Sequence, residues 1–227
     1  PAPRGAERAG VRSLAASDTP RGAELGRTDG TTAGTTLVRA LVPGPDSSAP
    51  RLMPFLLRGG HCAFLARDAD FAQAVWISDG TAAGTRRLGA FDAPGGQTPL
   101  SLDGRMFYRA ADQRRSGDVL WCSDGTATGT LALVDAAQGI DYRNPSLLGV
   151  AGPRVFFQTD GMGLGQELWT TDGTIAGTRR LRSGMTPLPP TIAAAAVATG
   201  DRLVFVGSET ASGPEPFISD GTAAGTR

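Results

Sequence analysis

The acids and hydroxyls of one seven-residue motif, Asp-Gly-Thr-x-x-Gly-Thr, are the groups in this chain whose types and spacing could do chemistry. The motif occurs five times, beginning at Asp29, Asp79, Asp124, Asp172 and Asp220. A carboxylate beside two hydroxyls could ligate Ca²⁺, but such a site takes about 6–8 oxygens and usually several carboxylates. Each copy supplies one Asp, without the alternating acids of an EF-hand loop. A Ca²⁺ site stays the alternative, and we predict a structural turn.

The motif has the composition of an ordered corner between the third and fourth strands of a repeat. Asp-Gly after a strand is a strong turn signal, and glycine adopts positive φ without steric cost. The Asp carboxylate can accept hydrogen bonds from the backbone two residues on, and Thr hydroxyls can act in the same way. We expect a second special φ at the later glycine of each copy, which lies at 34, 84, 129, 177 and 225.

Catalytic signals are few. His61 is the single histidine, beside Cys62, and the sequence contains neither H-E-x-x-H nor G-x-S-x-G. A structural or surface histidine is therefore expected. Gly161–Gly165 is glycine-rich, but it joins two predicted strands instead of opening a helix, so we interpret it as a hairpin loop. We predict no catalytic, cofactor-binding or metal-binding residue, and no cofactor.

Cys62 and Cys122 lie 60 residues apart and form no metal-binding spacing. Buried free thiols are the expected state, with a disulfide between neighbouring repeats as the alternative. Asn144 precedes Pro145, which excludes the usual glycosylation sequon there.

The motif recurs at spacings of 50, 45, 48 and 48 residues, a period typical of propellers, solenoids and arrays. Each period contains four short apolar runs, many of them rich in aromatic and β-branched residues and separated by glycine, proline or small polar loops. Representative runs are Arg51–Leu57, Cys62–Leu65, Ala74–Trp76, Arg86–Phe91, Leu131–Val134 and Thr191–Val197. We predict four strands in each repeat.

Leu120 and Trp121 are adjacent and so point to opposite faces of a strand, which makes both faces apolar. Sheets stacked on both sides need that pattern, and radial stacking of four-stranded sheets gives a β-propeller. The predicted fold is therefore all-β, a β-propeller or propeller fragment of four-stranded antiparallel blades with a period of about 48 residues. Residues 1–227 form one repeat array, with repeats at about 10–50, 51–98, 99–144, 145–190 and 191–227; the first begins at its second strand and the last is incomplete.

Two further positions recur. The aromatic at 76, 121, 169 and 217 is expected to wedge between blades, with a carbohydrate-stacking platform as the alternative; the first repeat has Gly26 there. Arginines follow the motif at Arg86-Arg87, Arg179-Arg180 and Arg227. Solvated strand ends are the favoured interpretation, and a positive rim is the alternative.

Net charge is zero, with 22 basic and 22 acidic residues, which does not favour nucleic-acid binding. No apolar run approaches the roughly 18 residues that span a bilayer. The chain starts Pro-Ala-Pro and stops inside a repeat, so we expect a segment of a longer polypeptide. The connectors Pro43–Pro50 and Pro94–Gln97 are candidate exposed loops for a partner.

Glu167-Leu168-Trp169-Thr170-Thr171-Asp172-Gly173-Thr174 matches in full the pattern of the ELWxxDGT repeat family of bacterial proteins, and the other copies match in part. The chain resembles that family over essentially its whole length. The resemblance implies a secreted or surface-attached protein with propeller-like repeats and no established activity. The expected function is a non-catalytic extracellular binding or scaffold module for a protein or carbohydrate ligand. The alternatives are an enzyme that uses the central funnel, or a Ca²⁺-dependent adhesion module.

Overall fold

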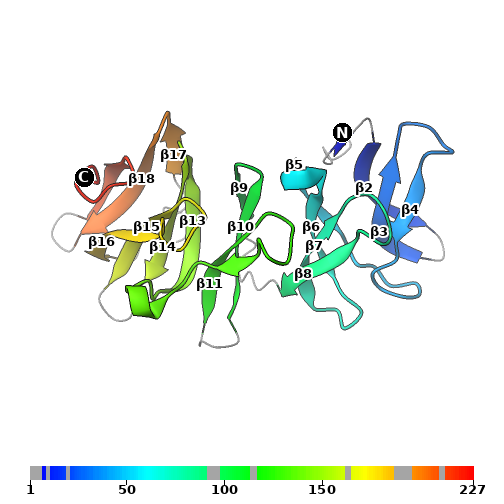
Figure 1. Cartoon of the computed structure of the whole chain (residues 1–227), viewed down its shortest axis with the longest axis horizontal. Helices are drawn as coiled ribbons and strands as arrows, with labels where there is room; N and C mark the ends of the chain where they lie inside the picture. The colour runs from blue at the N-terminus through cyan, green and yellow to red at the C-terminus, as the bar shows by residue number, and fades with distance from the viewer. Residues whose placement is uncertain are drawn as a thin grey trace. The chain divides into compact units, whose positions relative to one another are not determined.

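Nearly all regular structure in the computed structural model is β-strand (Figure 1). The structure describes residues 7–8, 11–18, 21–90, 98–112, 117–161, 165–186, 196–209 and 213–227. These residues form four sheets of four strands and one of three, each a meander in which strands adjacent in sequence pair. The prediction of an all-β fold of four-stranded antiparallel sheets is confirmed.

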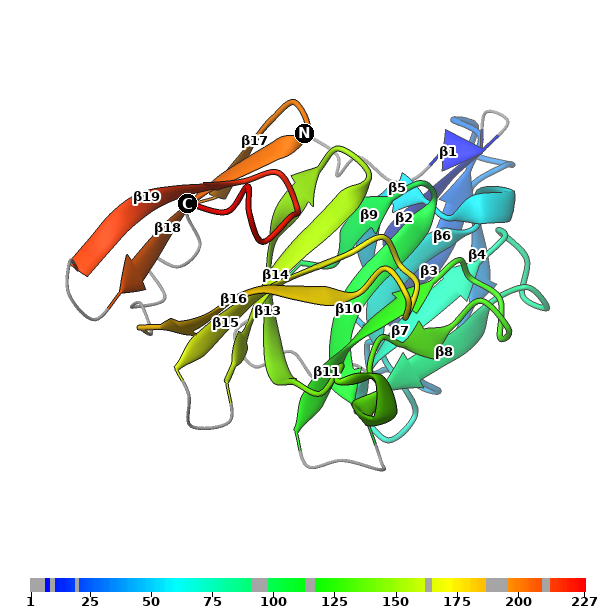
Figure 2. The same cartoon turned by 60° about the vertical axis from the view of Figure 1, so that its left-hand side comes forward.

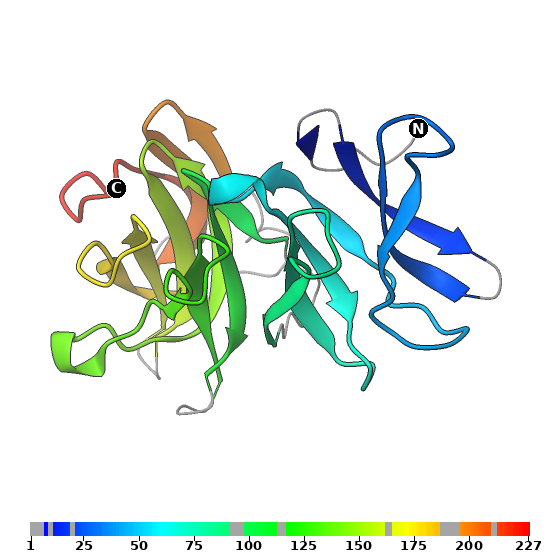
Figure 3. The same cartoon turned by 45° about the vertical axis from the view of Figure 1, so that its right-hand side comes forward.

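The first two sheets are simple meanders (Figure 3). The first contains β1 (Glu7–Arg8), β2 (Val11–Asp18), β3 (Arg21–Thr28) and β4 (Thr36–Arg39). The second contains β5 (Arg51–Leu56), β6 (Cys62–Arg67), β7 (Gln73–Ser78) and β8 (Arg86–Ala90), with a 3-10 turn, η1 (Arg58–Gly60), between β5 and β6.

The remaining sheets follow the same order. The third contains β9 (Leu100–Leu102), β10 (Arg105–Ala111), β11 (Asp118–Ser123) and β12 (Leu131–Ala132), followed by η2 (Ala136–Gln138). The fourth contains β13 (Arg143–Ala151), β14 (Arg154–Asp160), β15 (Gln166–Thr171) and β16 (Arg179–Met185). The fifth contains β17 (Ala196–Thr199), β18 (Arg202–Glu209) and β19 (Gly213–Ser219).

Strand patterning explains why these sheets stack. In β14, Phe156 and Phe157 point to opposite faces, yet both are fully buried. Phe157 pairs with Trp169 across the β14–β15 ladder, and their rings stack with centroids 6.3 Å apart. A sheet apolar on both faces needs a neighbour on each side.

The chain divides into two compact bodies. The first body comprises Pro1–Asp92, Asp103–Arg105 and Ser123–Thr130; the second comprises Ala93–Leu102, Met106–Cys122 and Leu131–Arg227. In the first body, Phe64 and Trp76 of the second sheet pack with Leu25 and Val38 of the first. The second body holds two cores, one joining the third and fourth sheets around Phe157 and one joining the fourth and fifth around Phe205.

One prediction about strand order was wrong. The two-residue strand β1 pairs with β2, with Glu7 opposite Arg12, so the first sheet does not begin at its second strand. In the fifth repeat, the predicted run Thr191–Val197 falls within the described residues only from Ala196, where β17 begins. The repeat boundaries themselves stay a prediction.

Candidate functional site

The five Asp-Gly-Thr corners share one hydrogen-bond pattern. Each follows the third strand of its sheet, and in the first four sheets it leads into the fourth strand, as predicted. In the fourth sheet, Asp172 Oδ1 accepts from the Thr174 backbone N at 2.9 Å and from Thr174 Oγ1 at 2.7 Å. The same Thr174 oxygen accepts from the Gly177 N at 2.9 Å. Thr178 Oγ1 closes the corner by donating to the Thr174 carbonyl at 2.7 Å. The motif's hydroxyls and one carboxylate oxygen are thus used within the corner itself.

The two glycines of each corner are needed for different reasons. The first glycine has positive φ in every copy, between +82° at Gly221 and +94° at Gly30. The prediction of a special φ at the second glycine was wrong. A Cβ on Gly177 would lie 2.0 Å from Asp172 Oδ1, and the other four copies show the same collision at 1.9 to 2.1 Å. That position requires glycine because the carboxylate of the same corner occupies the space of a side chain.

The corner lowers the pKa of its Asp. For Asp29, Asp79 and Asp220, the hydrogen bond from the Thr hydroxyl two residues on is the main cause, followed by the Thr backbone N–H. For Asp124 and Asp172, burial acts in the opposite direction, but the same two hydrogen bonds still bring the pKa below its ordinary value. All five aspartates are therefore ionised at neutral pH and bind the corner most tightly in that state.

The arginines that follow three of the five corners were predicted to be solvated strand ends, with a positive rim as the alternative. Arg87, Arg179, Arg180 and Arg227 are exposed, as expected for solvated strand ends, but two of the arginines also bond to the next sheet. Arg179 donates to the carbonyl of Gly221, the first glycine of the next sheet's corner, at 2.9 Å. Arg86 makes the equivalent bond to Gly125 within the first body. In the first sheet Thr36 holds this position, and Arg27 of β3 donates to the Gly80 carbonyl at 3.3 Å instead. We call this contact the corner latch.

The Glu and Trp of the repeat form a pair. Trp169 Nε1 donates to Glu167 Oε2 at 2.9 Å, and Arg180 donates to Glu167 Oε1 at 2.7 Å. The second and third repeats carry Ala74 and Val119 in place of Glu. In those repeats the buried Nε1 atoms of Trp76 and Trp121 have no hydrogen-bond partner. The predicted wedge position is thus buried at Trp76, Trp169 and Phe217. Of the three tryptophans at this position, the one with a hydrogen-bonded Nε1 is Trp169, which has a Glu two residues before it.

In the first repeat Glu24 lacks a Trp partner and holds a loop instead. Its buried carboxylate accepts from the Leu41 N at 2.8 Å and from Ser48 Oγ at 2.7 Å. Ser48 lies in the connector Pro43–Pro50, predicted as an exposed partner loop, and its carbonyl also accepts from the Arg67 N at 2.8 Å. This part of the connector is held against the sheets. The other connector, Pro94–Gln97, lies outside the described residues.

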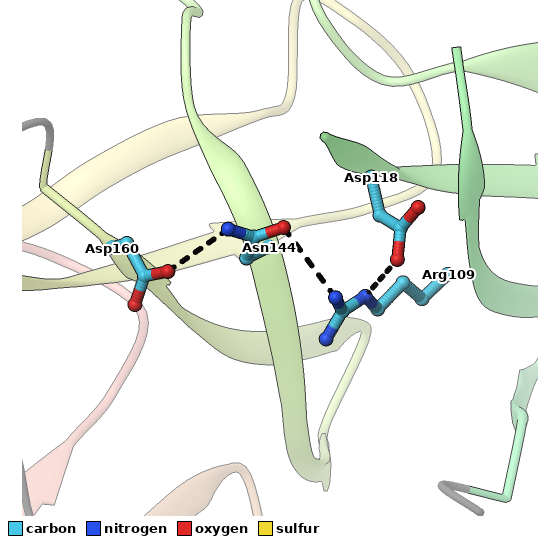
Figure 4. Close-up of polar contacts among 4 residues, drawn as sticks. All are labelled: Arg109, Asp118, Asn144 and Asp160. Atoms are coloured by element: carbon cyan, nitrogen blue, oxygen red, sulfur yellow. Dashed lines mark hydrogen bonds and ion pairs between the residues drawn. The ribbon is translucent and has the colours of Figure 1, made fainter. Parts of the chain in front are cut away.

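A polar cluster that sequence reasoning missed joins the third and fourth sheets (Figure 4). Asp118 pairs with Arg109, whose NH2 group donates to Asn144 Oδ1 at 3.4 Å. Asn144 Nδ2 in turn donates to Asp160 Oδ2 at 3.0 Å. Asn144 has φ of +50°, a conformation that Asn tolerates better than most residues. No spacing rule connects these positions, and the left-handed Asn is the single local signal.

The same body contains a second brace between sheets. Arg182 of β16 pairs with Glu209 of β18, and its guanidinium lies 5.3 Å from the centre of the Phe217 ring. Polar side chains therefore join neighbouring sheets in two ways: through side-chain contacts such as Arg182–Glu209, and through the bonds to the corners.

The remaining candidates are isolated. His61 is partly buried, and its Nδ1 lies 3.4 Å from the Arg58 carbonyl oxygen. Cys62 and Cys122 are buried thiols that form no disulfide, as expected, and burial raises the pKa of Cys62. The Gly161–Gly165 loop joins β14 and β15, with the Gly161 N donating to the Gly165 carbonyl at 2.8 Å. Within the described ranges, no group of three or more His, Cys, Asp or Glu side chains could hold a metal.

Among the described residues, no helix is long and apolar enough to cross a bilayer.

Comparison with known proteins gives a fold but no family. No family model matches the chain, and no curated protein matches it. Among solved structures, one from a study of two prolyl endopeptidases matches with a TM-score of 0.53 and 13% identity over 97% of this chain and 35% of that one. A puromycin hydrolase matches with a TM-score of 0.51 and 14% identity over 96% of this chain and 34% of that one.

The β-propeller domain of the Trilobed protease from Pyrococcus furiosus matches at a TM-score of 0.46 and 10% identity, over 93% of this chain and 64% of that one. The chain spans about a third to two thirds of the length of these matched chains. Together with the four-stranded antiparallel meanders, the two matches with a TM-score above 0.5 define the class of protein: its fold is that of a β-propeller or of a fragment of one. At these identities the likeness concerns the fold alone.

Proposed function

We propose that the chain is a non-catalytic binding or scaffold module of a secreted or surface-attached bacterial protein built from ELWxxDGT-type repeats. One observation carries the proposal: the polar groups of the recurring motif are used to build and join sheets. Asp172 Oδ1 and the Thr174 hydroxyl bind within their own corner, and Arg179 binds the corner of the next sheet. The repeat is therefore a structural unit, and recognition falls to the loops, which differ from sheet to sheet.

The Glu of the repeat supports the same interpretation. Glu167 bonds to Trp169 and Arg180, and Glu24 bonds to the backbone and side chain of its own connector. An acid that acts on a substrate needs an oxygen directed at that substrate, whereas these acids bind neighbouring protein groups. The ligand is proposed to be a protein or a carbohydrate, bound outside the cell by a longer polypeptide to which this chain belongs.

The proposal is tested by assaying binding and turnover with the same preparation. The purified chain is applied to an array of oligosaccharides and secreted proteins, and separately incubated with fluorogenic peptide and glycoside substrates. We expect binding without turnover. Asp172→Asn is the matched control: it changes a corner residue and is expected to alter the melting temperature without altering which ligands bind. Turnover that disappears in His61→Gln or Asp160→Asn would contradict the proposal and favour an enzyme.

A further inference from the structure

Within the second body, the fifth sheet leaves one apolar face uncovered, although the equivalent face of the fourth sheet is buried. Val204 lies sixteen residues before the corner Asp of the fifth sheet, as Phe156 does in the fourth sheet. Pro216 lies four residues before that Asp, as Leu168 does in the fourth sheet. Phe156 and Leu168 are fully buried against the fifth sheet, whereas Pro216 is exposed and Val197 beside Val204 is 61% exposed. Figure 2 shows β17, β18 and β19 in orange and red. A sheet face patterned for burial but left open marks an interaction surface.

The open face is hollowed. Ala196, Val197, Val204, Phe205, Val206 and Pro216 line a hollow of about 280 Å³. Its lining is almost wholly apolar, as is the face of the fourth sheet that packs on the fifth.

A second observation, at the corner, indicates what fits this face. On the fourth sheet two arginines contact the corner of the fifth. Arg179 donates to the Gly221 carbonyl, and the Arg154 side chain lies against Gly221, where an added Cβ would be 2.4 Å from Arg154 Cδ. The equivalent residues of the fifth sheet are Arg227 and Arg202, seven residues after and eighteen before its Asp. These two arginines line a small open pocket of about 70 Å³ with Ile218, Asp220 and Gly225.

The geometry points to one occupant: we propose that the fifth sheet binds a further repeat of the same kind, carried by the same polypeptide. That repeat would place its aromatic strand on Val204 and Pro216, and its corner glycine against Arg202 with the glycine carbonyl bonded to Arg227. This arrangement continues the interface that the fourth sheet already makes with the fifth. A carbohydrate or an unrelated helix would cover the apolar face but would not present a glycine carbonyl to the arginines.

The test extends the chain with its own sequence. Because Arg227 and Arg179 hold the same position, a second copy of residues 180–227 appended after Arg227 continues the repeat in register. Val204→Glu is then made in the parent chain and, at the original position 204 only, in the extended chain. We expect the melting temperature of the parent to be unchanged and that of the extended chain to fall by about 5–10 °C, since a charge would then be buried unpaired. Leu37→Glu, at an exposed apolar position of β4, is the matched control and should act equally in both chains.

A second measurement does not depend on the stability of the Glu variant. Val204→Cys should react rapidly with a thiol reagent in the parent chain and at least ten times more slowly in the extended chain. Equal effects of Val204→Glu in both chains, or equal labelling of Val204→Cys, would overturn the proposal. Concentration-dependent association of the parent that Val204→Glu abolishes would also overturn it, because a second copy of the chain would then occupy the face.

Discussion

Replacing the second glycine of a corner by alanine should have opposite effects on stability depending on whether the corner Asp is present. Gly177 does not have positive φ, so backbone conformation alone permits alanine there. A Gly→Ala change at such a site ordinarily stabilises by about 0.4–1 kcal/mol, because the unfolded chain loses freedom. In the native sequence the new Cβ would lie 2.0, 2.2 and 2.3 Å from three atoms of the Asp172 carboxyl group. The carboxylate must therefore leave its position.

The size of the effect follows from the bonds that are lost. When the carboxylate moves, the Thr174 N–H and Thr174 hydroxyl lose their acceptor. The loss resembles that of a helix-capping side chain, which costs about 0.5–2 kcal/mol. Asp172→Ala should cost the same amount, because it removes the same acceptor. In that background Gly177→Ala meets no carboxylate, so it should stabilise by about 0.4–1 kcal/mol.

The assay is a double-mutant cycle in which the free energy of unfolding is measured by urea denaturation, with tryptophan fluorescence as the signal. Gly173→Ala is the control: Gly173 has φ of +89°, so alanine should destabilise equally with and without Asp172. If Gly177→Ala destabilises equally in the native and Asp172→Ala chains, the collision with the carboxylate is not the reason for glycine, and the account of the corner is wrong.

The remaining predictions concern charge and burial. The folded-state pKa of each corner Asp is lowered, so its contribution to stability is present above the ordinary Asp pKa of 3.8 and is lost as pH falls through the lower folded pKa. Acid unfolding should therefore shift to higher pH in Thr174→Val, and an unchanged acid midpoint would contradict this. Glu167→Ala should destabilise by about 1–3 kcal/mol in urea, because Trp169 Nε1 is left buried without an acceptor; Glu215→Ala, at the equivalent exposed position, is the control and should be neutral. Arg179→Ala should lower the melting temperature, because the Gly221 carbonyl loses its donor from the neighbouring sheet, and an unchanged melting temperature would show that the latch does not stabilise the two sheets. Cys62 and Cys122 should resist a thiol reagent until the chain unfolds; rapid labelling of the native chain would refute their burial.

Much of the fold was predictable because each signal is local. Asp-Gly at a strand end fixes a turn through the conformational freedom of glycine and the acceptor on Asp, and both operate within a few residues. The spacing of the motif gives the length of the repeat, and the four apolar runs in each repeat predict four strands. Adjacent apolar residues such as Leu120 and Trp121 predict that both faces of a sheet are buried. The run at Leu131–Val134 shows the limit, since regular strand geometry there extends over Leu131–Ala132 alone.

The candidate site was far less predictable. The role of the second corner glycine was misjudged, because a collision between Gly177 and a carboxylate five residues earlier depends on the folded path of the corner. The cluster of Arg109, Asp118, Asn144 and Asp160 joins residues from four strands, and no spacing rule links them. The cross-sheet bond from Arg179 to Gly221 likewise could not be inferred from one repeat alone, because its acceptor lies 42 residues away.

The sequence by itself determined the repeat, the corner and the two-faced strands of this protein, because turn chemistry and side-chain alternation act between near neighbours. Only the tertiary structure decided which polar groups are used to join sheets and which face remains open. Those outcomes depend on which residues of different repeats come within hydrogen-bonding or van der Waals distance. Arg179 and Arg227 make the point: they occupy the same place in their repeats, yet one holds a glycine carbonyl and the other lines an open pocket.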